Sequence, residues 1–347
     1  MLNETLRTTD IRRIAIVGSG LAGLTAAIKL KQQGHKITVF EKSRGPGGRL
    51  AAKQVNNGSA DIGAQYFTAR NPEFLPFLCE HAGDCSFSVW GGRFGFQGAN
   101  NQWQVFPNEL RYVGVPRMTA ISRALSAHVT VVADTRVERL VRAGEYWLLF
   151  DANGEQVDKC DQVIVTAPPA QARKLLVQSN LPELAEQLND AVNRVLPCWA
   201  VAARFEGNPW PHHEGIRCNH PAIYWAANNS SKPDRDNKNQ SDTGTWWVLH
   251  ASAEWTVQNV DTAPERVAKE LIAAFRELTG TEIPTADSVT HRWLYARSDG
   301  GDSPGHLWFE KQNIGLAGDW LSGGRVEGAF NSACSLVSAY TQSLVSR

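Results

Sequence analysis

Ile14-Ala15-Ile16-Val17, followed at once by Gly18-x-Gly20-x-x-Gly23, is the stretch near the start of the chain that decides its fold. A second apolar stretch, Ile37-Thr38-Val39-Phe40, ends in the acid Glu41. This pattern predicts a buried strand, a tight turn, a helix and a second strand. A dinucleotide-binding βαβ unit requires the same order, so the sequence predicts a site for an adenine dinucleotide.

The three glycines and the acid have separate tasks in such a unit. Gly18 makes the tight turn, Gly20 lets the backbone approach a pyrophosphate, and Gly23 lets the helix pack closely on the sheet. Glu41 lies where a carboxylate accepts hydrogen bonds from a ribose diol. The cofactor-binding residues predicted in this unit are Gly18, Ser19, Gly20, Leu21, Ala22, Gly23 and Glu41.

The segment that follows reads Lys42-Ser43-Arg44-Gly45-Pro46-Gly47-Gly48-Arg49. A glycine pair followed by an arginine, directly after the second strand, resembles the second signature of FAD proteins of the amine oxidase and glutathione reductase type. The resemblance implies that backbone amides and the arginine meet the pyrophosphate and the flavin. It adds Lys42, Arg44, Gly48 and Arg49 to the predicted cofactor-binding residues.

The far end of the chain carries Asn313-Ile314-Gly315-Leu316-Ala317-Gly318-Asp319. This run predicts a short buried strand, and a helix is expected from about Val326 to Ser343. FAD proteins of this class use such an Asp on the ribityl or phosphate region and aim the following helix at the isoalloxazine. A helix N-terminus carries roughly half a positive elementary charge, which would stabilise reduced flavin at its pyrimidine edge.

A closer resemblance is carried by longer runs, of which Ala64-Gln65-Tyr66-Phe67-Thr68-Ala69-Arg70 is the most specific. Together these runs are similar to bacterial renalase. The others are Glu41 to Gly45, Arg111 to Gly114, Pro197 to Ala202, His291 to Arg297, Gly318 to Trp320 and Gly324 to Ala329, so the similarity extends over nearly the whole chain.

The resemblance implies an FAD-dependent oxidase of the 2- and/or 6-dihydro isomers of NAD(P). In that family hydride moves to flavin N5, and O2 then reoxidises the flavin to give NAD(P)+ and H2O2. Because the chemistry belongs to the flavin, no catalytic side chain and no metal are expected. FAD is expected to be bound non-covalently, since Cys334 in the last helix is interpreted as a core residue rather than an attachment point.

The resemblance also implies which residues surround the two ligands. The further cofactor-binding residues are Ala64, Gln65, Val137, Thr166, Asp319, Glu327 and Gly328. The predicted substrate-binding residues are Tyr66, Phe67, Thr68, Ala69, Arg70, Val105, Phe106, Pro107, Trp199, Trp293, Tyr295 and Val326. Among these, Trp199, Trp293 and Tyr295 are expected to bracket the flavin, because a flat dihydropyridine stacked beside it needs aromatic walls.

The predicted fold is α/β, with an FAD-binding Rossmann-like βαβ domain and an inserted mixed-sheet substrate domain, of the p-hydroxybenzoate hydroxylase or amine oxidase type. The FAD-binding domain is predicted to be discontinuous, with segments 1–74, 110–170 and 287–347, and the substrate domain takes 75–109 and 171–286. Strands are expected at Val129 to Val132, Trp147 to Phe150, Gln162 to Thr166, Cys198 to Phe205 and Thr245 to Ala251, and helices near Met118 to Ala127 and Pro264 to Thr279.

Two further segments have distinctive compositions. The segment from Phe87 to Phe106 is rich in aromatic residues and has several glycines between them. This composition suggests short strands and turns of the inserted sheet. Residues 228–244 contain Asn, Ser, Asp and Lys and no apolar residue except Pro233. This composition predicts an exposed, mobile loop.

The composition excludes several classes of protein. The 347 residues include 35 basic and 35 acidic side chains, so no net charge draws nucleic acid or an anionic membrane. Met1 to Arg13 is polar, and no segment approaches the ~20 apolar residues of a membrane span. Six cysteines without a Cys-x-x-Cys pair are typical of reduced thiols, so a cytoplasmic location is expected.

Alternatives from other classes stay open. A flavin amine oxidase would place an aromatic pair near Asp319, where this chain offers Trp320 and no tyrosine. A catalytically idle FAD-binding module is a second alternative, as is a partner that recruits others through residues 228–244. The sequence has no second dinucleotide-binding unit, so a nicotinamide dinucleotide would enter as substrate, with O2, over the flavin. The preferred isomer, the choice between NAD and NADP and the oligomeric state are left open.

Overall fold

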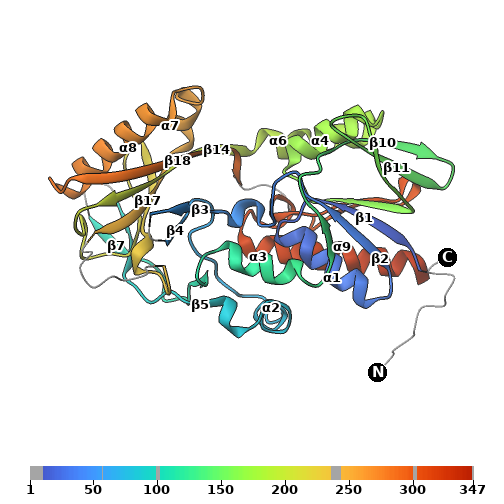
Figure 1. Cartoon of the computed structure of the whole chain (residues 1–347), viewed down its shortest axis with the longest axis horizontal. Helices are drawn as coiled ribbons and strands as arrows, with labels where there is room; N and C mark the ends of the chain where they lie inside the picture. Colours follow the sequence, from blue (N-terminus) through green and yellow to red (C-terminus); the bar gives the residue numbers. More distant parts are fainter. Residues whose placement is uncertain (1–10, 57, 99–101, 236–243, 300–302, 346–347) are drawn as a thin grey trace.

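The computed structural model describes residues 11–56, 58–98, 102–235, 244–299 and 303–345. Figure 1 shows two lobes, one built on a mostly parallel sheet and the other on a larger, mostly antiparallel sheet. No helix within the described ranges is long and apolar enough to cross a membrane. The helices and the two sheets confirm the α/β fold expected from the sequence.

The first lobe begins with the unit that the glycine motif predicts: β1 (Arg13–Val17), α1 (Leu21–Gln32) and β2 (Lys36–Phe40). Its six-stranded sheet has the order β19-β20-β13-β1-β2-β9. Strand β1 pairs in parallel with β2 on one side and with β13 on the other. The remaining strands are β9 (Thr130–Val132), β13 (Gln162–Val165), β20 (Ile314–Leu316) and the antiparallel edge β19 (Leu307–Phe309).

Both faces of this sheet are covered, which explains why its strands are continuously apolar. Ile14, Ile16 and Ile164 pack against α1 and α9 (Val326–Val345). Ala15 and Val163 face the opposite layer. That layer consists of β10 (Val137–Ala143), β11 (Tyr146–Asp151), β12 (Gln156–Cys160), α4 (Pro169–Gln178), α5 (Pro182–Glu186) and α6 (Asn189–Asn193).

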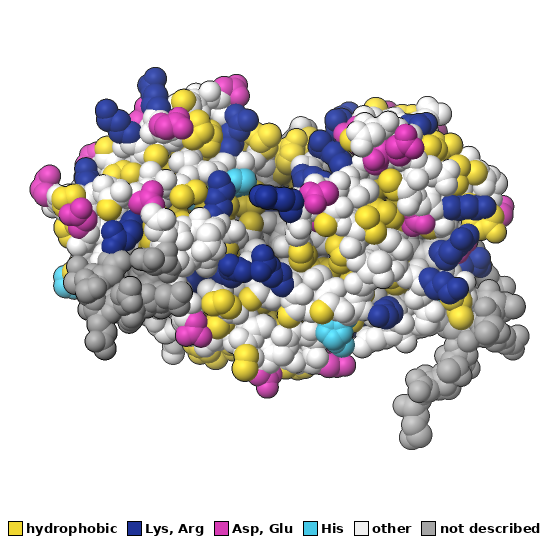
Figure 2. All heavy atoms as spheres, in the orientation of Figure 1, with side chains coloured by type: hydrophobic (Ala, Val, Ile, Leu, Met, Phe, Trp, Pro, Cys, Tyr) yellow, Lys and Arg dark blue, Asp and Glu magenta, His cyan; other side chains and the backbone are white. Residues whose placement is uncertain are grey.

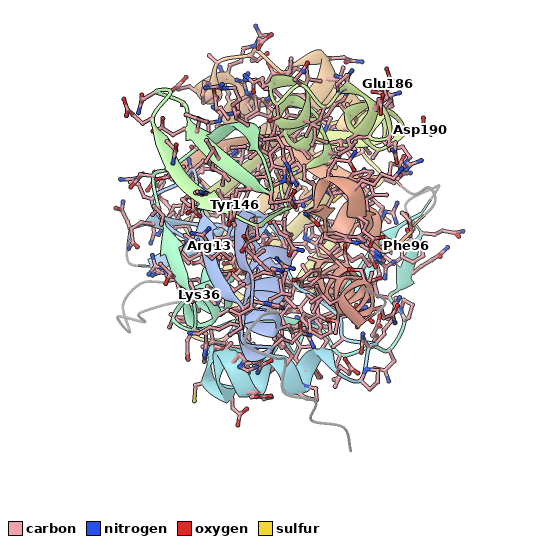
Figure 3. The ribbon with its side chains drawn as sticks, turned by 90° about the vertical axis from the view of Figure 1, so that its right-hand side faces the viewer. Arg13, Lys36, Phe96, Tyr146, Glu186 and Asp190 are labelled. Atoms are coloured by element: carbon pink, nitrogen blue, oxygen red, sulfur yellow. The ribbon has the colours of Figure 1, made fainter. Side chains whose placement is uncertain are left out.

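Figure 3 shows how this layer meets the first sheet at its rim, where Arg13 of β1 lies beside Tyr146 of β11. The guanidinium carbon of Arg13 is 5.5 Å from the centre of the Tyr146 ring. A cation over an aromatic face is attracted by the ring quadrupole. This contact therefore helps to fix the small antiparallel sheet on the parallel one.

The second lobe is a seven-stranded sheet of order β18-β14-β17-β16-β15-β6-β7. Its core is formed on one face by Val201, Phe205 and Trp247, against Leu271 and Phe275 of α8. The helix α8 (Pro264–Thr279) begins with a proline in its first turn and ends at Gly280, whose φ is +66°. The other elements are β6 (Phe94–Gln97), β7 (Trp103–Val105), β14 (Val195–Phe205), β15 (Gly215–Arg217), β16 (Ile223–Asn228), β17 (Thr245–Ala251), α7 (Ala253–Gln258) and β18 (Thr285–Ser298).

Short elements connect the lobes. The hairpin of β3 (Ala52–Val55) and β4 (Gly58–Asp61) lies between them in Figure 1. Helices α2 (Phe74–Ala82) and α3 (Thr119–Ser126) pack together, and β5 (Phe87–Val89) pairs with β8 (Tyr112–Gly114). Single turns of 3-10 helix occupy Gly48–Leu50, Asp84–Ser86, Asn229–Ser231, Glu310–Gln312 and Asp319–Leu321.

The structure corrects the predicted domain boundaries in two places. The boundary at residue 287 cuts through β18, which pairs with β14 from Thr285 to Ser298 and so belongs to the second sheet. The segment 75–109 is also divided: β6 and β7 join the second sheet, whereas Phe77 of α2 packs against Phe330 of α9. Pairing between distant strands, which local composition does not encode, determines both outcomes.

The prediction that residues 228–244 form an exposed loop is wrong for residues 228–235. Asn228, Asn229, Lys232 and Arg235 are all buried, and Lys232 and Arg235 both contact the buried carboxylate of Asp61. A polar segment is buried here because its charges find partners on β4. Residues 236–243 lie outside the described residues.

Candidate functional site

A cavity of about 1910 Å³ extends from the turn after β1 to the second sheet. Its wall includes the segment 40–52, the run around residues 62–70, strand β18 and the start of α9. Lys and Arg side chains gather in the middle of the face shown in Figure 2, where the two lobes meet. Because these segments come from both predicted sites, one cavity joins the predicted dinucleotide site to the predicted substrate site.

The glycine turn at one end of the cavity has the three features that the motif predicts. Gly18 has a φ of +108°, which glycine adopts without strain. A side chain at Gly20 would project into open space on the cavity wall, with no atom within 4 Å. A Cβ at Gly23 would overlap the carbonyl oxygen of Gly18, so this glycine allows α1 to approach β1.

Glu41 lines the cavity at the end of β2 and is held by its neighbours. Its Oε2 accepts hydrogen bonds from the backbone N–H of Ser19 at 3.0 Å and from the Ser19 hydroxyl at 2.7 Å. Its Oε1 accepts one from the backbone N–H of Ser43 at 2.9 Å. The carboxylate is thus fixed beside the glycine turn, where a ribose diol would reach it.

An ion pair brings the two predicted FAD signatures together. The Arg49 guanidinium lies 2.5 Å from the Asp319 carboxylate, with both side chains mostly buried. Asp319 also accepts a hydrogen bond from the backbone N–H of Trp320. Residues separated by most of the chain therefore share one stretch of cavity wall.

The start of α9 is fixed by contacts that leave its first turn at the cavity. Glu327 accepts hydrogen bonds from the backbone N–H groups of Arg70 and Asn71, at 2.6 and 2.5 Å. A Cβ at Gly328 would overlap the carbonyl oxygen of Ser322, so this glycine permits the close approach of the preceding turn. The positive end of the helix consequently lies on the cavity wall, near Val326.

The substrate half of the cavity has aromatic walls. Tyr66 packs between Phe94 and Trp225, with ring centres 6.2 and 5.7 Å away. The buried side chain of Arg111 lies over the ring of Phe106 and donates hydrogen bonds to the carbonyl oxygens of Pro107 and Glu109. Arg111, which is not among the predicted site residues, therefore holds the segment 106–109 on the wall.

Most of the predicted site residues line this cavity. They include the cofactor-binding candidates Gly18, Gly20, Leu21, Ala22, Glu41, Lys42, Arg44, Gly48, Arg49, Ala64, Gln65, Val137, Thr166, Asp319 and Glu327. They also include the substrate-binding candidates Tyr66, Phe67, Thr68, Arg70, Phe106, Pro107, Trp293, Tyr295 and Val326. The run from Ala64 to Arg70 contains one isolated bridge, between Phe67 and Tyr112, rather than a regular strand.

Three of the substrate-binding candidates lie off the cavity wall. The Trp199 ring is buried in the core under α7 and donates a hydrogen bond to the carbonyl oxygen of Asn259 at 2.9 Å. Val105 is 86% exposed, and Ala69 packs into the core beside α2. Alternation along β14 explains Trp199, because neighbouring side chains of a strand point to opposite faces.

Three cofactor-binding candidates are also absent from the wall. Ser19 turns its hydroxyl toward Glu41, whereas Gly23 and Gly328 are packing positions for helices. Arg70 is on the wall, yet its side chain is 60% exposed and pairs with Glu109 at 2.7 Å. A substrate anion would therefore have to compete with Glu109 for this arginine.

Two histidines line the cavity, and one of them comes from a strand that carried no sequence motif. His250 of β17 donates from Nε2 to the carbonyl oxygen of Ile62 at 3.1 Å, and Trp293 donates to the same oxygen at 3.0 Å. Burial lowers the pKa of His250 to about 4, and Lys232 and Arg297 add to this effect. Burial and Lys53 lower the pKa of His291 to about 4.

The residues at the glycine-turn end fit an FAD molecule. The space beside Gly20 is open for a pyrophosphate, and Glu41 is placed for a ribose. Arg49 and the start of α9 supply positive charge farther along the same wall. Fold and site together define an FAD-binding, two-lobed oxidoreductase.

The comparisons with known proteins give the family. Residues 16–80 match the model of an NAD(P)-binding Rossmann-like domain. Residues 82–339, the greater part of the chain, match the model of flavin containing amine oxidoreductases. The chain belongs to the flavin containing amine oxidoreductase family, and its cofactor is FAD.

Individual relatives are similar over a short part of the chain. A zeta-carotene-forming phytoene desaturase of Myxococcus xanthus is 48% identical over 56 residues, which are 16% of this chain and 11% of that protein. Protoporphyrinogen oxidase 2 of Arabidopsis thaliana is 44% identical over 62 residues, or 18% and 12% of the two chains. The matched segment thus spans only about a tenth of these curated relatives.

Solved structures share the fold over nearly the whole length. A candidate protoporphyrinogen oxidase from Exiguobacterium sp. 255-15 superposes with a TM-score of 0.74 at 14% identity, covering 95% of this chain and 98% of that one. Putrescine oxidase with bound putrescine gives a TM-score of 0.70 at 13% identity, covering 97% and 99%. At these identities the likeness shows the fold alone.

Proposed function

We propose that the protein is an FAD-dependent oxidase of isomeric dihydro-NAD(P), acting on the 2- and/or 6-dihydro forms as renalases do. The observation that carries the proposal is the charge of the cavity wall. Its carboxylates are held by protein partners: Glu109 by Arg70, Asp319 by Arg49, and Glu327 by backbone N–H groups. Arginines outnumber them on the wall, which suits an anionic nucleotide and repels the cation of an amine substrate.

The aromatic walls support the same substrate class. Tyr66, Trp293 and Tyr295 line one continuous cavity with the cofactor-binding residues. A planar dihydropyridine can stack between such rings and the cofactor, which holds it in the reactive orientation. Bound FAD would take two electrons from the dihydropyridine ring and return them to O2, giving NAD(P)+ and H2O2.

The amine oxidase alternative loses its aromatic candidate in the structure. Trp320 is buried in the core under α4, and its indole nitrogen donates to the carbonyl oxygen of Ala167 at 3.3 Å. It does not belong to the cavity wall. Trp320 therefore cannot contribute to the aromatic pair near Asp319 that an amine oxidase would require.

Anaerobic mixing of the purified yellow protein with candidate substrates tests the proposal. We expect 2- or 6-dihydro-NAD(P) to bleach the flavin far faster than ordinary NADH or an amine such as putrescine. Readmitted O2 should restore the colour with one H2O2 formed per nucleotide oxidised. Rapid bleaching by the amine, with none by the isomers, would establish the amine oxidase instead, and no bleaching by either would indicate an idle module.

Three finer assignments belong to the same proposal. FAD is bound non-covalently, because burial raises the pKa of the cavity thiols Cys198 and Cys218 to about 12 and so keeps them protonated. Acid precipitation should therefore release the flavin into the supernatant, and flavin left in the pellet would refute this.

The six cysteines are free thiols, which supports a cytoplasmic location that cell fractionation can check. The second sheet, from β6 to β18, serves as the substrate domain.

A further inference from the structure

Two arginines of the second sheet meet at one tyrosine on the cavity wall. The guanidinium carbon of Arg297, from β18, lies 4.0 Å from the centre of the Tyr224 ring. That of Arg217, from β15, lies 5.0 Å from the same centre. All three residues line the cavity.

These two guanidinium groups differ from three paired arginines on the same wall. Arg49, Arg70 and Arg292 each form an ion pair, with Asp319, Glu109 and Asp261 respectively. Within the described ranges, neither Arg217 nor Arg297 lies within ion-pair distance of a carboxylate. The Tyr224 ring attracts both cations, but it does not neutralise their mutual repulsion. An anion bound beside the two guanidinium groups would neutralise this repulsion.

The position of Arg297 connects the pair to the proposed site of reaction. Arg297 is near enough to His250 for its charge to help lower the pKa of that histidine, after the larger effects of burial and Lys232. His250 in turn shares the Ile62 carbonyl oxygen with Trp293. The arginine pair is therefore a neighbour of the aromatic walls, on a different sheet from the glycine turn that receives the cofactor.

We propose that Arg217 and Arg297, held on Tyr224, bind a phosphate group of the nucleotide substrate. Guanidinium groups offer planar pairs of N–H donors that match phosphate oxygens, and Arg is favoured over Lys for such recognition. The identity of the ligand as a nicotinamide dinucleotide rests on the proposed function. The phosphate itself is either the pyrophosphate that NAD and NADP share or the 2′-phosphate that only NADP carries.

Equilibrium binding to the FAD-loaded protein tests this assignment without turnover. The probes are NAD+, NADP+ and nicotinamide riboside, which has no phosphate, titrated calorimetrically into the wild-type protein and the variant Arg217→Gln/Arg297→Gln. We expect the double substitution to weaken NAD+ binding about 30-fold or more and to leave the riboside within twofold. Weakening confined to NADP+ would assign the pair to the 2′-phosphate.

Arg292→Gln is the matched control, because Arg292 is on the same strand and the same wall but is paired with Asp261. It removes one positive charge and should change NAD+ affinity by less than twofold. Unchanged dinucleotide binding in the double variant would overturn the proposal. So would equal weakening of riboside binding, or a wild-type protein that does not bind NAD+ at all.

Flavin reduction by the dihydro isomers separates this inference from the proposed function. If binding of NAD+ depends on the arginine pair while no isomer bleaches the flavin, the phosphate site stands and the proposed activity fails. If the isomers bleach the flavin equally well in the double variant, with the same dependence on substrate concentration, the activity stands and the phosphate site fails.

Discussion

His250 and His291 are uncharged near neutral pH, and this affects the stability of the protein as well as its cavity. Their pKa values of about 4 are lower than the ordinary value of 6.5, chiefly because burial penalises the charged ring. The ordinary value returns when the chain unfolds. Between about pH 6.5 and 4 the unfolded state therefore binds more protons than the folded state, and acid favours unfolding.

We expect the free energy of unfolding to fall as the pH is lowered from 7.5 to 5, with His250 accounting for at most about 2 kcal/mol of the loss. Urea unfolding at pH 7.5 and at pH 5 measures this loss of unfolding free energy. His250→Gln should show a smaller loss than the wild-type protein, whereas His212→Gln, at an exposed position, should match the wild type. Equal losses in all three proteins would show that His250 does not resist protonation.

Single residues also show what the sequence could and could not predict. Gly18, Gly20 and Gly23 have backbone roles that a short motif encodes, and the structure places each glycine as its role requires. Trp199 was predicted on the cavity from a family resemblance, but its face of the strand is set by the pairing of β14 with β17 and β18. His250 and Arg217 carried no signal, because isolated residues in buried strands form no pattern.

Helix α9 illustrates how the absence of a side chain at one position allows a segment to pack closely. Its predicted start at Val326 is confirmed, and the observed end lies two residues beyond the predicted Ser343. Gly328 in its first turn lies against the backbone of Ser322, whose carbonyl carbon would be 3.1 Å from an added Cβ. Any side chain there would push the helix away from the turn that follows Asp319.

Gly328→Ala is therefore expected to destabilise the protein by about 1–3 kcal/mol, as overpacking does, and to weaken FAD binding. Thermal unfolding and flavin titration of the apoprotein measure the two effects. Gly45→Ala is the matched control, because Gly45 also lines the cavity but an added Cβ would meet no atom within 4 Å. Wild-type behaviour of Gly328→Ala would mean that the first turn of α9 can shift at no cost.

Local signals predicted some segments better than others. Pro264 and Gly280 mark the ends of α8, and the structure has the predicted bounds, Pro264–Thr279. The alternation in residues 64–70 is compatible with a strand, but these residues contact different neighbours one by one. Glu327, for example, accepts from the backbone N–H of Arg70, and Phe67 makes the single bridge to Tyr112. Contacts of this kind depend on partners far away in the chain.

The two lobes are joined by a buried cluster of charges. Asp61 of β4 accepts hydrogen bonds from Lys232 at 3.1 Å and from Arg235 at 2.5 Å, and all three side chains are fully buried. Burial alone would raise the pKa of Asp61, but the charges of Lys232 and Arg235 hold it below its ordinary value. Lys232 also donates to Gln65 of the cavity wall at 3.0 Å.

Asp61→Asn should cost about 3–5 kcal/mol of unfolding free energy, because it leaves two buried cations without their counter-charge. Urea unfolding at pH 7.5 provides the measurement. The exposed pair of Arg266 and Glu270 is the control, and Glu270→Gln should cost less than about 1 kcal/mol. Similar small costs for both variants would show that solvent reaches the cluster around Asp61.

This cluster also explains why the fate of residues 228–235 could not be predicted. Asn, Ser, Asp and Lys are typical of exposed loops, and nothing near residue 228 indicates otherwise. The partner of Lys232 and Arg235 is more than 170 positions earlier in the chain. The overall α/β fold, by contrast, follows from strands and helices with local patterns, which is why it was predictable.

The contact between Arg49 and Asp319 has a consequence for the order of events during synthesis. The wall that would receive the cofactor needs β1, β13, β20 and the start of α9, which the ribosome delivers early, midway and late. A nascent chain that ends before Asp319 has the glycine turn but neither the counter-charge of Arg49 nor the helix. We therefore expect nascent chains that end before Asp319 to retain no flavin, whereas chains that include the start of α9 should retain it.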